Sequence, residues 1–421
     1  MAGPSALLFP RLLHYIYKDL GFHTLDSIRF RAFKEGGTVG KRVLISYLLA
    51  GSGHLSVALA IEHYLKEKQP LWDIRLFEPA EDLKDKALDR YFKQAWRRIL
   101  EMPDIAAQVI FDMDEALPLL SSFVTSQYMR TAVLKSMGYL KGFRPDVIVS
   151  THWGCTHIFN KARKKLGLQV PLYYVFTELA GVYQLLNCGA DLYFAMSPQA
   201  GQDLQKAGIA PDKMKLINFV VRPGFSQSGL ACRYRAKEAI GIQADSFTLL
   251  LSVGGEGIGS IGGFISAFLE TVSGGTIIIM TGRNQSLFDE LSAKFRNGRV
   301  LVFGYREDME SVMAAADVLA GKCGASYSME AILTGTPFIV THIGAPSERP
   351  NMNYIVENGY GWYAPTPSKF TAVLKEILDT PEFYQKSVNS LTRVPRQNGA
   401  EEIALHVIAG VQRGGGSGDG V

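Results

Sequence analysis

The feature that most constrains the fold of this chain is an alternation of short, almost wholly apolar runs with segments of helical periodicity. Strands that are buried on both faces of a parallel sheet have such runs, and the helices between them cover the sheet. The runs form two blocks: 42–50, 72–77, 145–153, 171–179 and 190–197, then 247–255, 275–283, 299–305, 316–324 and 336–343. The pattern therefore predicts an α/β protein with two doubly wound, Rossmann-like domains.

The two blocks also give a domain organisation, because 421 residues favour two domains over one. The connection between them is rich in Gly, Ser and Arg and spans 222–236. The expected parts are an amphipathic N-terminal segment (1–39), a first domain (40–225), a second domain (237–390), a helix that can cross back to the first domain (391–412) and a flexible tail (413–421).

Charge and cysteine content exclude some classes of function. The 44 Lys and Arg against 40 Asp and Glu give a net charge of +4, which is too small to imply nucleic acid but suits a basic patch facing phosphates or anionic lipid. The cysteines (Cys155, Cys188, Cys232 and Cys323) have no CxxC spacing. They therefore indicate neither a disulfide framework nor a zinc site, and a reducing compartment is expected.

The N-terminal segment has two interpretations. Its apolar stretch is interrupted by Pro10 and carries Arg11 and Lys18, so neither a bilayer-spanning helix nor a signal peptide is expected. It can lie in a membrane interface with its apolar side buried, or it can be an amphipathic helix packed on the domain.

The first informative loop, at 50–54, joins the first strand to its helix. Gly51, Ser52 and Gly53 allow the backbone to approach a phosphate or an acceptor, and the helix N-terminus supplies N–H donors. Ser56 replaces the third glycine of the dinucleotide fingerprint, so an NAD site is disfavoured. His54, in the first helical turn, is a candidate general base, with a capping or structural role as the alternative.

The second block carries further polar or glycine-rich segments at the ends of its strands. Parallel strands bring such segments to one sheet edge, where ligands bind, although each alone also reads as an ordinary surface loop. The candidate donor-binding residues are Gly254, Gly255, Gly282, Arg283, Asn284, Gly304, Tyr305, Lys322, Gly324, Ser326, Glu330, Ser347, Glu348 and Asn351. Glycine loops and Arg283 suit a diphosphate, Glu330 suits the two ribose hydroxyls, and Glu348 with Asn351 suits the hydroxyls of a sugar.

At this point the sequence resembles a known family. Lys-x-Gly, Glu-Ala, Gly-x-Pro and Glu-x-x-Asn follow one another at Lys322, Gly324, Glu330, Ala331, Gly335, Pro337, Glu348 and Asn351. This order resembles the donor domain of GT-B glycosyltransferases, in the family 28-like group of monogalactosyldiacylglycerol synthases, processive diacylglycerol glucosyltransferases and the enzyme that adds N-acetylglucosamine to lipid I. The resemblance covers about 40–365, and the aromatic and basic segment 80–142 favours the diacylglycerol branch.

The resemblance implies an inverting, metal-independent transfer from a UDP-sugar, with no cofactor beyond that co-substrate. It assigns the role of general base to His54 and the binding of the ribose to Glu330. It assigns backbone contacts with uracil to Gly304 and Tyr305, and the binding of the hexose to Glu348 and Asn351. Two positions depart from the family pattern. Glu178 stands where an Asp is usual and is expected either to act as an acid or base, to orient His54, or to be a solvated strand end. Ser347 stands where Gln is frequent, which leaves the donor sugar open.

The leading expectation is a hexosyltransferase that acts on a lipid hydroxyl such as that of diacylglycerol, in the cytoplasm or an organelle stroma and peripherally bound to a membrane. The alternatives are an N-acetylglucosamine transferase acting on a peptidoglycan lipid precursor, a UDP-N-acetylglucosamine 2-epimerase, and a non-catalytic nucleotide-sugar-binding partner.

Overall fold

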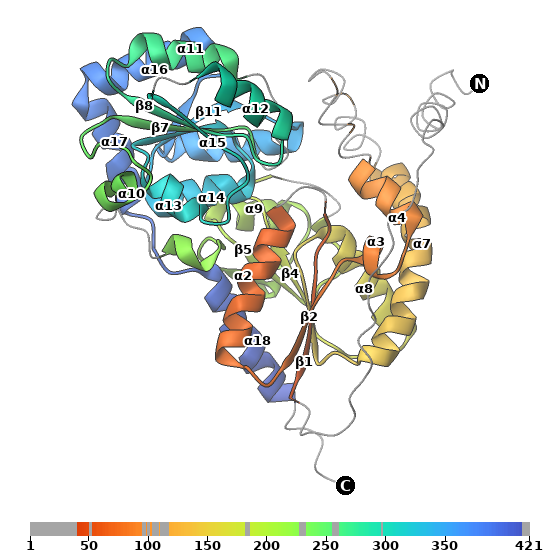
Figure 1. The fold of residues 1–421 in the computed structure, drawn as a ribbon. Helices are drawn as coiled ribbons and strands as arrows, with labels where there is room; N and C mark the ends of the chain where they lie inside the picture. Colours follow the sequence, from red (N-terminus) through yellow and green to blue (C-terminus); the bar gives the residue numbers. More distant parts are fainter. Residues whose placement is uncertain are drawn as a thin grey trace. The chain divides into compact units, whose positions relative to one another are not determined.

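The computed structural model describes residues 40–49, 53–94, 98, 102, 109, 118–181, 186–226, 233–254, 261–295 and 298–414. The N-terminal segment 1–39 and the tail 415–421 lie outside these residues, as do Gly51, Ser52 and Gly255. The described residues form two sheets of six parallel strands each, with helices on both faces (Figure 1). The predicted α/β class with two doubly wound, Rossmann-like sheets is confirmed.

The first sheet has the strand order β2-β1-β3-β4-β5-β6. Its strands are β1 Arg42–Ser46, β2 Asp73–Phe77, β3 Val147–Ser150, β4 Leu172–Phe176, β5 Leu192–Ala195 and β6 Met214–Leu216. Because β1 pairs with both β2 and β3, the chain changes its direction across the sheet between β1 and β3. Such a switch point leaves room for a ligand beyond the carboxyl ends of the two strands.

Helices cover both faces of this sheet. They are α2 Gly53–Lys68, α3 Pro79–Asp82, α4 Lys86–Asp89, the π-helix η2 Arg90–Gln94, α7 Pro118–Phe143, α8 Trp153–Lys165, α9 Pro198–Lys206, and the 3₁₀ turns η4 Pro211–Lys213 and η5 Pro223–Ser226. Alternate residues of β1 pack to opposite sides: Val43 and Ile45 lie in the core under α2, and Leu44 lies in the core under α7 and α8. The apolar run of the strand therefore reflects burial on both faces.

The second sheet has the order β12-β11-β10-β7-β8-β9, with its switch point between β7 and β10. Its strands are β7 Thr248–Ser252, β8 Thr276–Met280, β9 Val300–Phe303, β10 Val318–Lys322, β11 Phe338–His342 and β12 Gly361–Tyr363. Its helices are α10 Arg233–Ala239, α11 Gly262–Thr271, α12 Gln285–Lys294, α13 Met309–Ala314, α14 Ala325–Thr334, the 3₁₀ turn η7 Pro346–Glu348, α15 Arg349–Glu357, α16 Pro367–Asp379 and α17 Pro381–Thr392.

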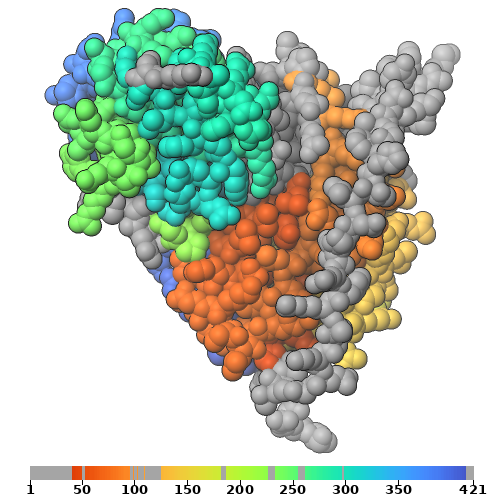
Figure 2. All heavy atoms as spheres, in the orientation of Figure 1, coloured from red at the N-terminus to blue at the C-terminus, as the bar shows by residue number. Residues whose placement is uncertain are grey.

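The last helix, α18 Gly399–Gly414, returns to the first sheet and lies beside α2 (Figure 1). Lys68 of α2 forms an ion pair with Glu401 at 2.6 Å, and the side chain of Asn218 donates to Glu402 at 2.7 Å. Residues of α14 also contact α2, and the space-filling view shows atoms of the second sheet's helices against those of α2 (Figure 2). The apolar core under α2 continues into the second sheet, since it includes Met329 and Ala331 of α14.

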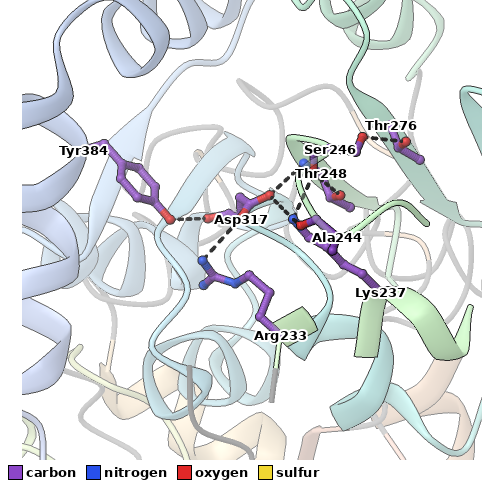
Figure 3. Close-up of polar contacts among 8 residues, drawn as sticks. All are labelled: Arg233, Lys237, Ala244, Ser246, Thr248, Thr276, Asp317 and Tyr384. Atoms are coloured by element: carbon purple, nitrogen blue, oxygen red, sulfur yellow. Dashed lines mark hydrogen bonds and ion pairs between the residues drawn. The ribbon is translucent and has the colours of Figure 1, made fainter. Parts of the chain in front are cut away.

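A polar cluster holds α10 at the amino ends of β7 and β10 (Figure 3). The carboxylate of Asp317 accepts hydrogen bonds from Arg233 at 3.1 Å, from Lys237 at 2.8 Å and from the backbone N–H of Thr248 at 2.8 Å. Lys237 is only 3% exposed and also donates to the carbonyl of Ser246 at 2.8 Å. This cluster lies at the amino ends of the strands, so it anchors α10 on the side of the sheet away from the carboxyl ends of the strands.

The sequence prediction missed two strands and part of the connection. β6 and β12 are three-residue edge strands, and the predicted connection 222–236 contains η5 and the start of α10. The long helical segment expected at 80–142 consists of α3, α4, η2 and α7 in its described parts. Among the described residues, none of the helices combines the length and hydropathy that crossing a bilayer requires.

Candidate functional site

His54 lies at the switch point of the first sheet. It is the second residue of α2, and its Nδ1 atom is 2.7 Å from the carbonyl oxygen of Thr151, which follows β3. The hydroxyl of Thr177, which follows β4, lies 3.1 Å from the same Nδ1. Because a carbonyl oxygen only accepts, Nδ1 carries the proton and donates it to Thr151, which leaves the lone pair on Nε2. This tautomer presents a proton acceptor at Nε2.

The surroundings of His54 keep its imidazole neutral. Burial lowers the pKa of His54 to about 4, and the hydrogen bond to Thr151 opposes this only in part. The ring of His152 lies edge-on to that of His54, with 4.7 Å between ring centroids, and Nδ1 of His152 accepts the N–H of Gly154 at 3.0 Å. Burial lowers the pKa of His152 well below its ordinary value, and His54 adds to this. Two neutral imidazoles therefore lie together at neutral pH.

Glu178 and Asn351 connect loops of the two sheets. Asn351 is fully buried in the first turn of α15, donates from Nδ2 to Glu178 Oε2 at 2.7 Å and accepts the N–H of Leu179 at 3.0 Å. Burial raises the pKa of Glu178 to about 7, although the bond from Asn351 opposes the shift. Among the described residues the orientation of His54 comes from Thr151 and Thr177, whereas Glu178 is engaged with Asn351.

Lys322 and Glu348 form an ion pair at the carboxyl end of β10. Nζ of Lys322 lies 2.7 Å from Oε1 of Glu348, and the backbone N–H of Gly344 donates to Oε2 at 2.9 Å. Glu348 raises the pKa of Glu178 and Lys322 lowers it, so the charges of the three groups act on one another. A ligand anion that draws Lys322 away would release Glu348 to accept hydrogen bonds from hydroxyl groups.

The N-terminus of α14 follows Lys322 directly. Its cap residue, Gly324, has no side chain to occupy the first N–H groups of the helix, so these groups can donate to an anion. In the first turn of α14, Ser326 Oγ donates to the carbonyl oxygen of Gly53 at 3.5 Å, a long bond that brings α14 next to the start of α2. The N-terminus of α14 therefore contacts Gly53, the residue that precedes His54 in the sequence.

Glu330 lies further along α14 and is paired with a residue from the connection between the sheets. Nε and Nη2 of Arg222 each lie 3.2 Å from Oε1 of Glu330, and Nη1 of Arg222 donates to the carbonyl oxygen of Glu307 at 3.2 Å. Burial raises the pKa of Glu330 to about 6, and Arg222 opposes this rise. The carboxylate expected to take ribose is thus held close to the loop after β9.

The remaining predicted donor residues lie at the carboxyl ends of β7, β8 and β9. The guanidinium of Arg283 lies over the ring of Tyr305, 4.7 Å from its centroid, and Tyr305 is 55% exposed. Asn284 caps α12 by accepting the N–H of Leu287 at 2.9 Å. Gly254, Gly282 and Gly304 belong to the turns after these strands, where Gly254 (φ 80°) and Gly282 (φ 60°) need the left-handed conformation.

The sequence did not single out Thr151, His152, Thr177 or Arg222. Thr151, His152 and Thr177 lie near the carboxyl ends of the predicted strands 145–153 and 171–179, and Arg222 begins the predicted connection 222–236. These positions are the signal that could have marked them. Ser347 lies in η7 beside Glu348, and the predicted residues Gly51, Ser52 and Gly255 lie outside the described residues. Among the side chains described, no three of His, Cys, Asp or Glu are grouped as metal ligands.

Family models match both halves of the chain. Residues 54–221 match monogalactosyldiacylglycerol (MGDG) synthase, and residues 266–403 match the glycosyltransferase family 28 C-terminal domain. Monogalactosyldiacylglycerol synthase 1 of Arabidopsis thaliana is 27% identical over 255 residues, which cover 57% of this chain and 47% of that protein. The Spinacia oleracea synthase is 25% identical over 376 residues, 85% of this chain and 70% of that protein. Against several of these curated relatives, the matched region spans about half of their length.

Solved structures share the fold at low sequence identity. MurG of Acinetobacter baumannii has a TM-score of 0.57 at 15% identity, covering 89% of this chain and 99% of its own. The UDP-GlcNAc 2-epimerase of Neisseria meningitidis, solved with UDP-GlcNAc bound, has a TM-score of 0.54 at 14% identity, covering 88% and 100%. These likenesses agree with the expected GT-B architecture.

Proposed function

We propose that this chain, whose two halves match monogalactosyldiacylglycerol synthase and the glycosyltransferase family 28 C-terminal domain, is a glycosyltransferase. In this proposal it transfers a hexose from a UDP-sugar to a lipid hydroxyl such as that of diacylglycerol. One observation carries the proposal. The imidazole of His54, with its lone pair on Nε2, lies next to Gly53, which contacts Ser326 at the N-terminus of α14. A proton acceptor and an anion-binding helix end are what transfer from a nucleoside diphosphate requires.

In the proposed reaction Nε2 of His54 takes the proton of the acceptor hydroxyl. The acceptor oxygen then bonds to the anomeric carbon of the sugar while the bond from that carbon to the diphosphate oxygen breaks, and UDP departs. Attack from the side opposite the leaving group inverts the anomeric configuration. The hydrogen bond from Nδ1 to Thr151 stabilises the imidazolium that forms, because the charged ring is a stronger donor.

The donor is proposed to bind along the carboxyl ends of the second sheet. The N–H groups at the start of α14 and the ammonium of Lys322 take the diphosphate, and Glu330 takes the ribose hydroxyls. The backbone of Gly304 and Tyr305 is proposed to flank uracil. When Lys322 turns to the diphosphate, Glu348 becomes available to the hexose hydroxyls.

The diphosphate charge is proposed to be borne by the protein rather than by a divalent metal. The N–H groups at the start of α14 and the ammonium of Lys322 supply positive charge at the carboxyl end of β10, where this proposal puts the leaving group. Transfer that is unchanged by EDTA supports this part of the proposal. If EDTA abolishes transfer and Mg²⁺ or Mn²⁺ restores it, the proposed metal independence is contradicted, whereas the proposed sugar transfer is not.

The acceptor is proposed to come from a membrane surface. The exposed side of α7 carries Arg130 and Lys141 with Leu134, which is 54% exposed, and Arg144 follows the helix. Basic groups around an apolar side chain suit contact with anionic headgroups. Vesicle sedimentation of an Arg130→Glu, Lys141→Glu variant tests this: weaker binding to anionic vesicles than the wild type is expected, and equal binding would contradict it.

The experiment that tests the function is a panel of UDP-glucose, UDP-galactose and UDP-N-acetylglucosamine, each with diacylglycerol vesicles or with a polyprenyl-linked precursor, followed by mass analysis of the lipids. A hexosyl diacylglycerol is the expected product. Transfer to the polyprenyl lipid alone points to the peptidoglycan alternative. Conversion of the free UDP-sugar into its epimer points to an isomerase, and binding of UDP-sugars without turnover points to a non-catalytic partner. Each of these three results would contradict the proposal.

A further inference from the structure

Arg222 is held on three sides at the connection between the sheets. Its guanidinium lies 4.9 Å from the ring centroid of the buried Phe225, donates to the carbonyl of Glu307 at 3.2 Å and directs two nitrogens to Oε1 of Glu330 at 3.2 Å. A planar guanidinium with several fixed partners loses little freedom when it forms each of these bonds. Its position is therefore set by the chain before any ligand arrives.

The two polar partners of Arg222 belong to the two parts of the proposed nucleoside site. Glu330 is the residue proposed to take the ribose, and Glu307 lies in the loop that also contains Gly304 and Tyr305, proposed to flank uracil. Both nitrogens that face Glu330 are directed to Oε1, and within the described part of the chain no hydrogen bond is made to Oε2. Oε2 is thus left for a ligand hydroxyl.

We propose that Arg222 is a positioning residue of the nucleoside site, which fixes the carboxylate of Glu330 and ties it to the loop after β9, so that one guanidinium sets both the ribose and the base contacts. This inference rests on the proposed function, in which Glu330 binds the ribose of UDP. It makes Arg222 act through Glu330 rather than through a contact of its own with the ligand.

The charges around Glu330 explain why such a residue is needed. Burial raises the pKa of Glu330 to about 6, and Glu310 on α13 raises it further, whereas Arg222 lowers it. Tyr327, on α14 itself, is the other titratable group that interacts with Glu330. Arg222 is the only cation among the described residues that acts on this pKa, so its removal raises the pKa of Glu330 further.

The test compares Arg222→Gln, Arg222→Lys, Glu330→Gln and the double variant Arg222→Gln, Glu330→Gln, by calorimetric titration with UDP from pH 5.5 to 8.5. For Arg222→Gln we expect the Kd for UDP to rise by about tenfold at pH 6.5, and the difference from the wild type to shrink toward pH 8.5 as Glu330 ionises. Arg222→Lys keeps the charge and should restore the pH profile of the wild type, with a Kd between those of the wild type and Arg222→Gln. On the Glu330→Gln background, Arg222→Gln should change the Kd less than about twofold.

Three outcomes would overturn the inference. The Kd of Arg222→Gln can equal that of the wild type. The Kd of Arg222→Gln can instead exceed that of the wild type by the same factor at every pH, which a purely structural role predicts. The loss can also be the same with and without the carboxylate of Glu330, which a direct contact between Arg222 and UDP predicts.

A measurement without ligand separates this inference from the proposed function. A carboxyl group whose folded pKa lies above its unfolded value of 4.5 stabilises the fold below that value, and this stability is lost as the pH rises through the folded pKa of about 6. In Arg222→Gln this loss of stability should extend to higher pH. The free energy of unfolding of Arg222→Gln should therefore fall relative to that of the wild type between pH 6 and 8. The double variant should show no such fall relative to Glu330→Gln. Parallel curves would refute the coupling of Arg222 to Glu330. A wild type that binds no UDP would refute the proposed function and the nucleoside assignment with it.

Discussion

The side-chain amide of Asn351 donates from Nδ2 to Oε2 of Glu178 over 2.7 Å, and its Oδ1 accepts the backbone N–H of Leu179 over 3.0 Å. One buried side chain on α15 of the second sheet thus satisfies two groups in the loop after β4 of the first sheet. The resemblance to GT-B glycosyltransferases assigns Asn351 to the hexose. In this structure the same amide connects the two halves of the protein, so a sugar that recruits Asn351 must compete with Glu178.

Replacing Asn351 by Ala should therefore weaken the fold. The change leaves Glu178 and the N–H of Leu179 without a partner and opens a small cavity, and we expect a loss on the order of 3 kcal/mol in the free energy of unfolding. Asn353 is exposed on the same helix and provides the matched control, since Asn353→Ala should alter stability by less than about 0.5 kcal/mol. Urea unfolding measures both. Equal effects of the two changes would show that the contact with Glu178 contributes nothing.

The pH dependence of stability should reveal Glu178. Burial raises its pKa from 4.5 to about 7, so its contribution to stability is fully present below pH 4.5 and is lost as the pH rises through 7. Glu178→Gln removes this dependence. Between pH 4.5 and pH 8 the free energy of unfolding of Glu178→Gln should rise by on the order of 2 kcal/mol relative to that of the wild type, because each pKa unit corresponds to about 1.4 kcal/mol. Unfolding curves of the two proteins that stay parallel over this range would rule out a raised pKa.

His54→Ala should lower kcat far more than it changes the Kd for UDP. General-base catalysis contributes about 10²- to 10⁴-fold, so we expect a loss in that range. Because the pKa of His54 is lowered to about 4, the base is already neutral above pH 5, and wild-type kcat should not fall from loss of this base until the pH approaches 4. His63 is exposed on the same helix, and His63→Ala should retain full activity. Comparable losses in kcat and UDP affinity for His54→Ala would assign it a binding role.

Asp317 should matter for stability and not for the site. Asp317→Ala leaves the buried ammonium of Lys237 without its carboxylate, and loss of one partner of a buried pair costs about 3–5 kcal/mol. The control is Glu62→Ala, which breaks the surface pair with Lys66 and should cost less than about 1 kcal/mol. Calorimetric unfolding gives both values. A small, similar change in the two variants would mean that the cluster does not anchor α10.

The sheets could be read from the sequence because their strands carry continuous apolar runs, which burial on both faces requires. β6 and β12 were missed because a three-residue edge strand leaves no such run, and β6 is largely exposed. Lys322 could be named from its position at the end of a strand, and Glu330 from its position in the helix that follows. Their partners could not, since Arg222 and Glu330 are 108 residues apart in sequence and Asn351 and Glu178 are 173 apart. Only the fold decides which side chains meet, and that is why Glu178 is found with Asn351 rather than with His54.

The most direct test of the central claim measures two products in one reaction. Wild-type protein, a UDP-hexose and diacylglycerol vesicles are incubated together, and released UDP and lipid-linked hexose are both quantified over time. Hexose transfer by this chain predicts one hexosyl diacylglycerol for each UDP released, with both rates falling together in His54→Ala. Release of UDP without glycolipid, or no release with any hexose donor, would contradict it.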